Sequence, residues 1–178
     1  LLQNAQVPGP YIMVGHSLGG LIVRVFVHKY PSEVAGVVLI DSMNPKQLNQ
    51  SSDELMSRAE STSHPFSLQA TLARFGLIRL GTKVPGMAPS LPPSMAAYYP
   101  LYVRPQTLQA TDDEFQGLPA AEVQAGAVKS FGDLPLIVLT AKLNNIPGWQ
   151  EWQSELLQLS SNSQQLFAES GHNIQGDA

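Results

Sequence analysis

One short segment near the start of the chain has the residue types of a nucleophilic site. Residues 15–20 read Gly-His-Ser-Leu-Gly-Gly and lie between a short apolar run, Tyr11–Val14, and a stretch with helical periodicity. Strand, G-x-S-x-G and helix in this order are the context of the nucleophile elbow, a tight turn that strains the serine backbone and exposes its hydroxyl. Gly15 and Gly19 would avoid clashes in the turn, and Gly20 would let the helix pack closely on the sheet. The segment therefore predicts a nucleophilic Ser17, although the bare motif also occurs in ordinary glycine-rich turns.

The elements needed to hold such a turn alternate along the chain. Apolar runs without polar alternation, typical of strands buried on both faces of a parallel sheet, lie at Tyr11–Val14, Val37–Ile40 and Leu136–Thr140. A fourth strand is predicted at Gln164–Glu169. Helices are predicted at Leu18–Tyr30, at Leu118–Phe131 and at 149–159, where Trp149 and Trp152 lie on an apolar face. This alternation predicts an α/β fold with a parallel sheet and right-handed crossovers.

A long insertion interrupts this alternation. We expect an incomplete core of residues 1–42 and 131–178 and a mainly helical cap or lid of residues 43–130 above the carboxyl ends of the strands. The cap has an apolar set of side chains, Met87, Met95, Tyr98, Tyr99 and Tyr102. They would line a mainly hydrophobic pocket or form the small core of the cap itself.

Composition excludes several classes of function. The net charge is −4 and the few basic residues are scattered, which gives nucleic-acid binding no electrostatic support. Cysteine is absent, so disulfides and thiolate catalysis are excluded. The four histidines show no ligand spacing, so we expect no metal and no cofactor. No apolar run is long enough for a membrane span, and the compartment stays open.

With these anchors the chain resembles the C-terminal two-thirds of an α/β-hydrolase, from the nucleophile strand to the catalytic histidine. The resemblance covers residues 11–42 and about 118–175, and rests on GHSLGG and the later Ser-Gly-His of residues 170–172 in the family's chain order. The chain begins without Met and ends six residues after its last histidine. We therefore expect an N-terminally truncated fragment of that fold.

The resemblance assigns the general base to His172, in a loop that can fold back over the elbow. A base within hydrogen-bonding reach is needed because a neutral serine hydroxyl is a poor nucleophile. His16 is expected to pack under the elbow, and His28 and His64 are expected at the surface.

The acid of the triad is harder to assign. In much of the family it follows the strand at 136–140, but residues 141–147 contain neither Asp nor Glu. Some relatives place it after the preceding strand, where this chain has Asp41. Such an acid would orient the histidine, but Asp41 is also well suited to cap its own turn. Glu151 and Glu155 are expected to face solvent.

An oxyanion hole needs two backbone donors. The N–H of Leu18 is predicted to be one, reinforced by the helix dipole. The resemblance puts the second before residue 1, and losing such a donor typically slows a reaction ~100- to 1000-fold.

The leading hypothesis is a serine hydrolase that cleaves an ester or related acyl bond of a small, largely apolar substrate through an acyl-enzyme. A serine nucleophile argues against a dehalogenase, because relatives with that chemistry use a carboxylate. The alternative is a non-catalytic protein of the same fold that binds a ligand or partner. Perhydrolases and C–C bond hydrolases use the same triad and stay open.

Overall fold

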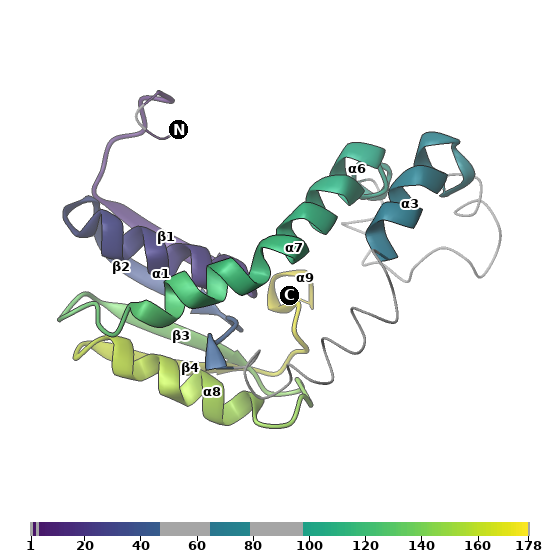
Figure 1. Cartoon of the computed structure of the whole chain (residues 1–178). Helices are drawn as coiled ribbons and strands as arrows, with labels where there is room; N and C mark the ends of the chain where they lie inside the picture. Colours follow the sequence, from purple (N-terminus) through teal and green to yellow (C-terminus); the bar gives the residue numbers. More distant parts are fainter. Residues whose placement is uncertain (1, 3, 47–64, 79–97, 178) are drawn as a thin grey trace. The chain divides into compact units, whose positions relative to one another are not determined.

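A parallel sheet organises the part of the chain that carries the predicted site (Figure 1). The computed structural model describes residues 2, 4–46, 65–78 and 98–177. The chain divides into two compact units, Leu1–Gln50 with Pro119–Ala178, and Ser51–Leu118. The predicted assignment of residues 43–130 to a cap stays a prediction.

The first unit contains four parallel strands in the order β1-β2-β3-β4. They are Tyr11–His16, Val34–Ile40, Leu136–Ala141 and Ser163–Ala168. Each lies where the sequence predicts a strand, and β2 begins three residues earlier than expected, directly after the 3₁₀ turn Pro31–Glu33. Since all four run in parallel, their carboxyl ends meet at the same edge of the sheet, as the α/β prediction requires.

Helices pack on one face of this sheet. Val23 and Val27 of α1 (Gly19–Lys29) and Leu156 of α8 (Trp149–Leu156) contact the side chains of that face. The 3₁₀ turn Leu157–Leu159 follows α8 and completes this cluster. The sheet side of the core consists of alternate residues in register: Met13, Val37, Leu39, Leu136 and Val138. Burial of these aliphatic groups fixes the register, because a one-residue slip would turn them all away from the helices.

The first strand is not buried on both faces, in contrast to the prediction. Ile12 and Val14 are 69% and 58% exposed. Strand residues alternate between the two faces, so the partly buried Met13 points to the helices while its neighbours point to the opposite face. The apolar run Tyr11–Val14 correctly predicted a strand but not its burial.

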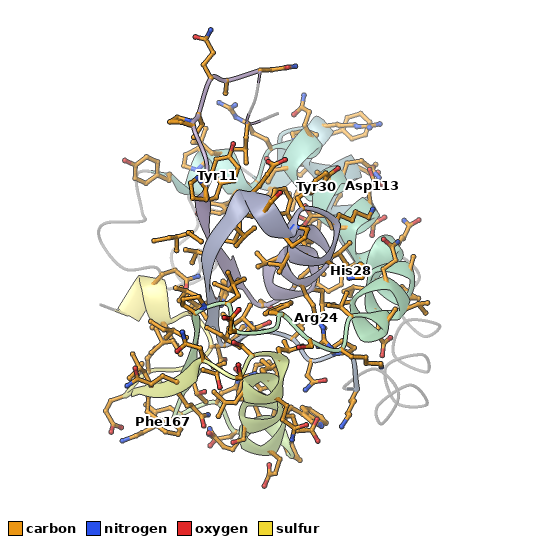
Figure 2. All side chains as sticks on the ribbon, turned by 90° about the vertical axis from the view of Figure 1, so that its left-hand side faces the viewer. Tyr11, Arg24, His28, Tyr30, Asp113 and Phe167 are labelled. Carbon is orange, nitrogen blue, oxygen red and sulfur yellow. The ribbon has the colours of Figure 1, made fainter. Side chains whose placement is uncertain are left out.

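A partly buried arginine links α1 to the segment that follows α7 (Pro105–Ala127). Arg24 donates from Nε to the carbonyl of Val128 over 3.1 Å, and its Nη2 donates to the same oxygen. In Figure 2 the Arg24 side chain lies between the α1 ribbon and the end of α7. Burial lowers the pKa of Arg24 to about 10, since desolvation disfavours the charged guanidinium.

The helix predicted at Leu118–Phe131 is wrong in its limits. The structure has one helix, α7, which begins at Pro105, passes through Pro119 and ends at Ala127. The Leu-Pro pair at 118–119 indicated a helix start, because proline favours the first turn. Here proline lies inside a helix, and the boundary between the two compact units falls at the same position.

The described elements of the second unit are helical. They are α3 (Pro65–Arg74), α6 (Tyr99–Tyr102) and the first part of α7. Ala70, Ala73 and Leu108 form a small buried cluster. Of the apolar set predicted for the cap, Tyr98 and Tyr102 are exposed, while Met87, Met95 and the side chain of Tyr99 lie outside the described part, as does His64. Across the described ranges, no helix combines the length and apolar character needed to cross a membrane.

Glu122 on α7, in the first unit, has a buried carboxyl oxygen whose effect on stability can be tested. Its Oε1 is buried without a hydrogen-bond partner among the described residues, and burial raises its pKa above the ordinary value of 4.5. Because the folded state then holds the proton more tightly than the unfolded state, the carboxyl group destabilises the fold above the unfolded pKa. That penalty vanishes at lower pH, where both states are protonated.

We therefore expect Glu122→Gln to raise the melting temperature at pH 7 by about 1–2 °C and to give no gain near pH 3.5. Thermal unfolding followed by circular dichroism at both pH values measures this. Glu151→Gln, at an exposed carboxylate of α8, should give no gain at pH 7. An equal gain for Glu122→Gln at both pH values would contradict the ionisation argument.

Candidate active site

The turn after β1 has the geometry of a nucleophile elbow. Ser17 has a φ of +53°, a left-handed conformation that non-glycine residues rarely adopt. Two hydrogen bonds hold it against the end of β2: Ser17 N–H donates to the Ile40 carbonyl over 3.2 Å, and Met43 N–H donates to the Ser17 carbonyl over 3.0 Å. The strained turn predicted from the sequence is confirmed, and neighbouring backbone sustains the strain.

The three glycines of the motif have different roles. A Cβ on Gly15 would lie 2.7 Å from the carbonyl oxygen of Gly19 in the opposite arm of the turn. A Cβ on Gly20 would lie 1.7 Å from Oγ of Ser42, so this glycine allows α1 to pack against the chain after β2, as predicted. A Cβ on Gly19 would meet nothing within 4 Å. The prediction that Gly19 avoids a clash is therefore not supported by its surroundings in the described residues.

The structure brings Ser17, His172 and Asp41 together. Nε2 of His172 lies 3.0 Å from Oγ of Ser17, and Nδ1 lies 2.7 Å from Oδ2 of Asp41. An ionised carboxylate can only accept hydrogen bonds, so Nδ1 carries the proton, and Nε2 of the neutral ring accepts a hydrogen bond from the serine hydroxyl. His172 is 36% exposed at its side chain, while that of Asp41 is fully buried.

The Asp41 side chain does not cap its own turn. Its carboxylate accepts from Ala141 N–H at 3.0 Å, Trp149 Nε1 at 2.7 Å and Asn144 Nδ2 at 2.9 Å, in addition to His172. The capping role, left open by the sequence, is thus not what these oxygens do. The backbone of Asp41 is strained like that of Ser17, with φ of +40°.

His16 does not simply pack under the elbow, as expected, but holds the loop of His172. Its Nε2 lies 2.8 Å from the His172 carbonyl oxygen and its Nδ1 lies 3.2 Å from Nε2 of Gln175. A carbonyl can only accept, so Nε2 carries the proton and Nδ1 accepts. The two imidazole rings are 4.7 Å apart. His16, the residue before Ser17, thus ties the loop of His172 to the elbow.

The remaining candidates lie elsewhere in the first unit. His28 is exposed on α1, as predicted (Figure 2). Glu151 is exposed in the first turn of α8. Glu155 forms an ion pair with Lys46 over 2.9 Å. Within the described ranges, no three acidic or histidine side chains gather to hold a metal ion.

Leu18 follows the nucleophile and has helical backbone angles, φ −53° and ψ −36°. No hydrogen bond between described residues uses its N–H. This donor lies at the start of α1, where the helix dipole favours negative charge. It is therefore available for an oxyanion next to Ser17.

Two contributors to this arrangement were not recognised from the sequence. Trp149 was interpreted as core packing, and it is buried, but its indole N–H is directed to Asp41. Asn144 lies in the loop after β3, where the sequence has no carboxylate. A polar side chain in a loop at the carboxyl edge of the sheet was the available signal.

Comparison with known proteins identifies the fold family. A family model for the alpha/beta hydrolase fold matches residues 2–178. The chain belongs to this family. An uncharacterized protein of Schizosaccharomyces pombe is 40% identical over 50 residues, which make up 28% of this chain and 9% of that protein.

Solved structures agree with this alpha/beta hydrolase assignment. DBJA has a TM-score of 0.65 at 15% identity over 99% of this chain and 66% of its own. A variant of N-formylmaleamic acid deformylase from Pseudomonas putida has a TM-score of 0.51 at 17% identity over 97% of this chain and 64% of its own. At these identities the likeness shows the fold. The chain spans just under two thirds of the length of both proteins.

The contrast between neighbouring glycines can be tested. Gly20→Ala should destabilise the protein by roughly 2–3 kcal/mol, as expected for an overpacked site, because the new methyl group would collide with Ser42. Gly19→Ala, one residue earlier in α1, should be neutral or slightly stabilising, because alanine favours the helix and has open space. Chemical denaturation of both variants measures the difference, and equal stabilities would refute the packing argument.

Proposed function

We propose that this protein is a serine hydrolase in which Ser17 is the nucleophile, His172 the general base and Asp41 the acid that supports it. The observation that carries this proposal is the continuous chain of contacts from Ser17 Oγ to His172 Nε2 at 3.0 Å and from His172 Nδ1 to Asp41 Oδ2 at 2.7 Å. Nucleophile, base and orienting acid within hydrogen-bonding reach are the features expected of an activated serine.

The reaction follows from the roles of these atoms. Ser17 Oγ attacks the carbonyl carbon of the substrate while His172 Nε2 accepts the hydroxyl proton. The imidazolium then transfers this proton to the leaving group, and an acyl-enzyme forms. Water, deprotonated by the same nitrogen, attacks the acyl carbon and releases the acid, and the proton returns to Ser17. The Asp41 carboxylate stabilises the imidazolium and keeps Nδ1 protonated throughout.

Leu18 would supply one N–H to the oxyanion of each tetrahedral intermediate. Its position directly after Ser17 and at the start of α1 supports this role, because backbone donors and a helix N-terminus both stabilise developing negative charge.

The substrate we propose is small and largely apolar, with an ester or related acyl bond. The apolar side chains of residues 87–102 suggested this in the sequence. The deformylase named above acts on an acyl bond of a small molecule according to its name. Perhydrolase or C–C bond hydrolase chemistry on the same triad would be a different outcome of a substrate screen.

The alternative, a non-catalytic binding protein, was favoured by the lack of a carboxylate in the loop after β3. The Asp41 contact with His172 argues against it, because a carboxylate from the end of β2 reaches the imidazole instead.

Covalent labelling separates the two functions. A fluorophosphonate probe should label the protein at Ser17, and Ser17→Ala should abolish labelling, while Ser161→Ala, at an exposed serine, should not. Asp41→Asn should lower the rate of p-nitrophenyl ester hydrolysis by up to about 10⁴-fold, because the amide favours the wrong tautomer of His172. A folded protein that neither reacts with the probe nor hydrolyses the ester would support the binding alternative.

A further inference from the structure

The loop after β3 and the start of α8 surround the acid with N–H donors. Ala141 ends β3, Asn144 lies in the loop, and Trp149 is the first residue of α8. Their N–H groups reach the Asp41 carboxylate at 3.0, 2.9 and 2.7 Å. The segment that carries no acid thus supplies three of the four hydrogen bonds that the carboxylate accepts.

These donors define the orientation of the carboxylate. Oδ1 accepts from Ala141 and Trp149, and Oδ2 accepts from Asn144 and His172. With two partners on each oxygen, rotation of the carboxylate about its bond to Cβ would break several hydrogen bonds together. Asp41 is fully buried, where no water replaces a lost donor and an unpaired charge is strongly disfavoured.

Trp149 contacts the base as well as the acid. Its ring meets the imidazole of His172 edge to face, with centroids 5.5 Å apart and planes at 89°. The indole therefore restricts the histidine ring while its N–H holds the carboxylate. Gly148, with φ of +78°, is the N-cap residue of α8 and places Trp149 as the first residue of the helix.

We propose that Asn144 and Trp149 are positioning residues that orient Asp41 toward His172, an inference that rests on the proposed function of this triad. Asn144 holds the oxygen that His172 uses, and Trp149 holds the other oxygen and packs on the imidazole. Neither touches the serine oxygen. Both act through the acid and the base.

Paired tryptophan variants test the role of Trp149. Trp149→Phe removes the indole N–H but keeps an aromatic ring, and Trp152→Phe makes the same change three residues later in α8. Trp152 is also buried, but no hydrogen bond between described residues uses its indole N–H. We expect Trp149→Phe to lower kcat for p-nitrophenyl acetate about 10- to 100-fold with little change in KM, and Trp152→Phe to change kcat less than 3-fold at a similar melting temperature.

Asn144 offers a test that leaves the core intact. Asn144→Ala should lower kcat about 10-fold, while Asn145→Ala, at an exposed neighbour, should not change it. Asn144→Asp should lower kcat more than Asn144→Ala, because two carboxylates within about 3 Å repel each other and compete for one proton. If Asn144 only filled space, the isosteric Asn144→Asp variant would keep a higher kcat than Asn144→Ala. That ranking of kcat values would overturn the proposal.

A measurement without substrate separates this inference from the proposed function. In the ¹⁵N-histidine NMR spectrum of the wild type, His172 should be a neutral Nδ1–H tautomer at a pH where the ring is uncharged. Trp149→Phe and Asn144→Ala should raise the share of the Nε2–H tautomer, and both controls should leave it unchanged. An unchanged tautomer with unchanged kcat would refute the positioning role, whereas an inactive wild type with the expected shift would refute only the hydrolase.

Discussion

The buried carboxylate of Asp41 is the interaction on which the candidate site depends. A fully buried charge needs hydrogen-bond donors, and this one takes them from the end of β3, the following loop, the start of α8 and the loop after β4. The same bonds therefore satisfy the charge and join four segments at one edge of the sheet. His172 receives its orientation as part of this network.

Parallel register explains why Ser17 and Asp41 are neighbours. His16 pairs with Ile40 and Ile40 pairs with Leu139, so the residues that follow β1 and β2 leave the sheet side by side. The backbone at Ser17 and at Asp41 is left-handed in both cases. Ser17 N–H and Asp41 N–H each donate to the neighbouring strand, and these bonds help to hold both strained residues in place.

Much of the core could be predicted because its signals are local. Apolar runs identified β1, β2 and β3, and prolines and glycines indicated where several helices begin and end. The prediction was wrong where long-range packing decides: Ile12 and Val14 are exposed, although their run indicated burial. It was also wrong at α7, where Pro119 lies inside the helix although a local rule places proline at a helix start.

The candidate site also divides into features set by local sequence and features set by long-range packing. Six consecutive residues are enough to predict a strained serine in a turn between strand and helix, because steric limits on the backbone act within a few bonds. By itself the sequence therefore determined the elbow, the strands beside it and the chain order of the candidates. Only the tertiary structure decided that Asp41 turns to His172, 131 residues away. It also decided that His16 holds the loop of His172 and that Trp149 and Asn144 donate to the Asp41 carboxylate. Those contacts depend on which strand ends meet at the edge of the sheet. The residue types along the chain do not by themselves specify which side chains are brought into contact there.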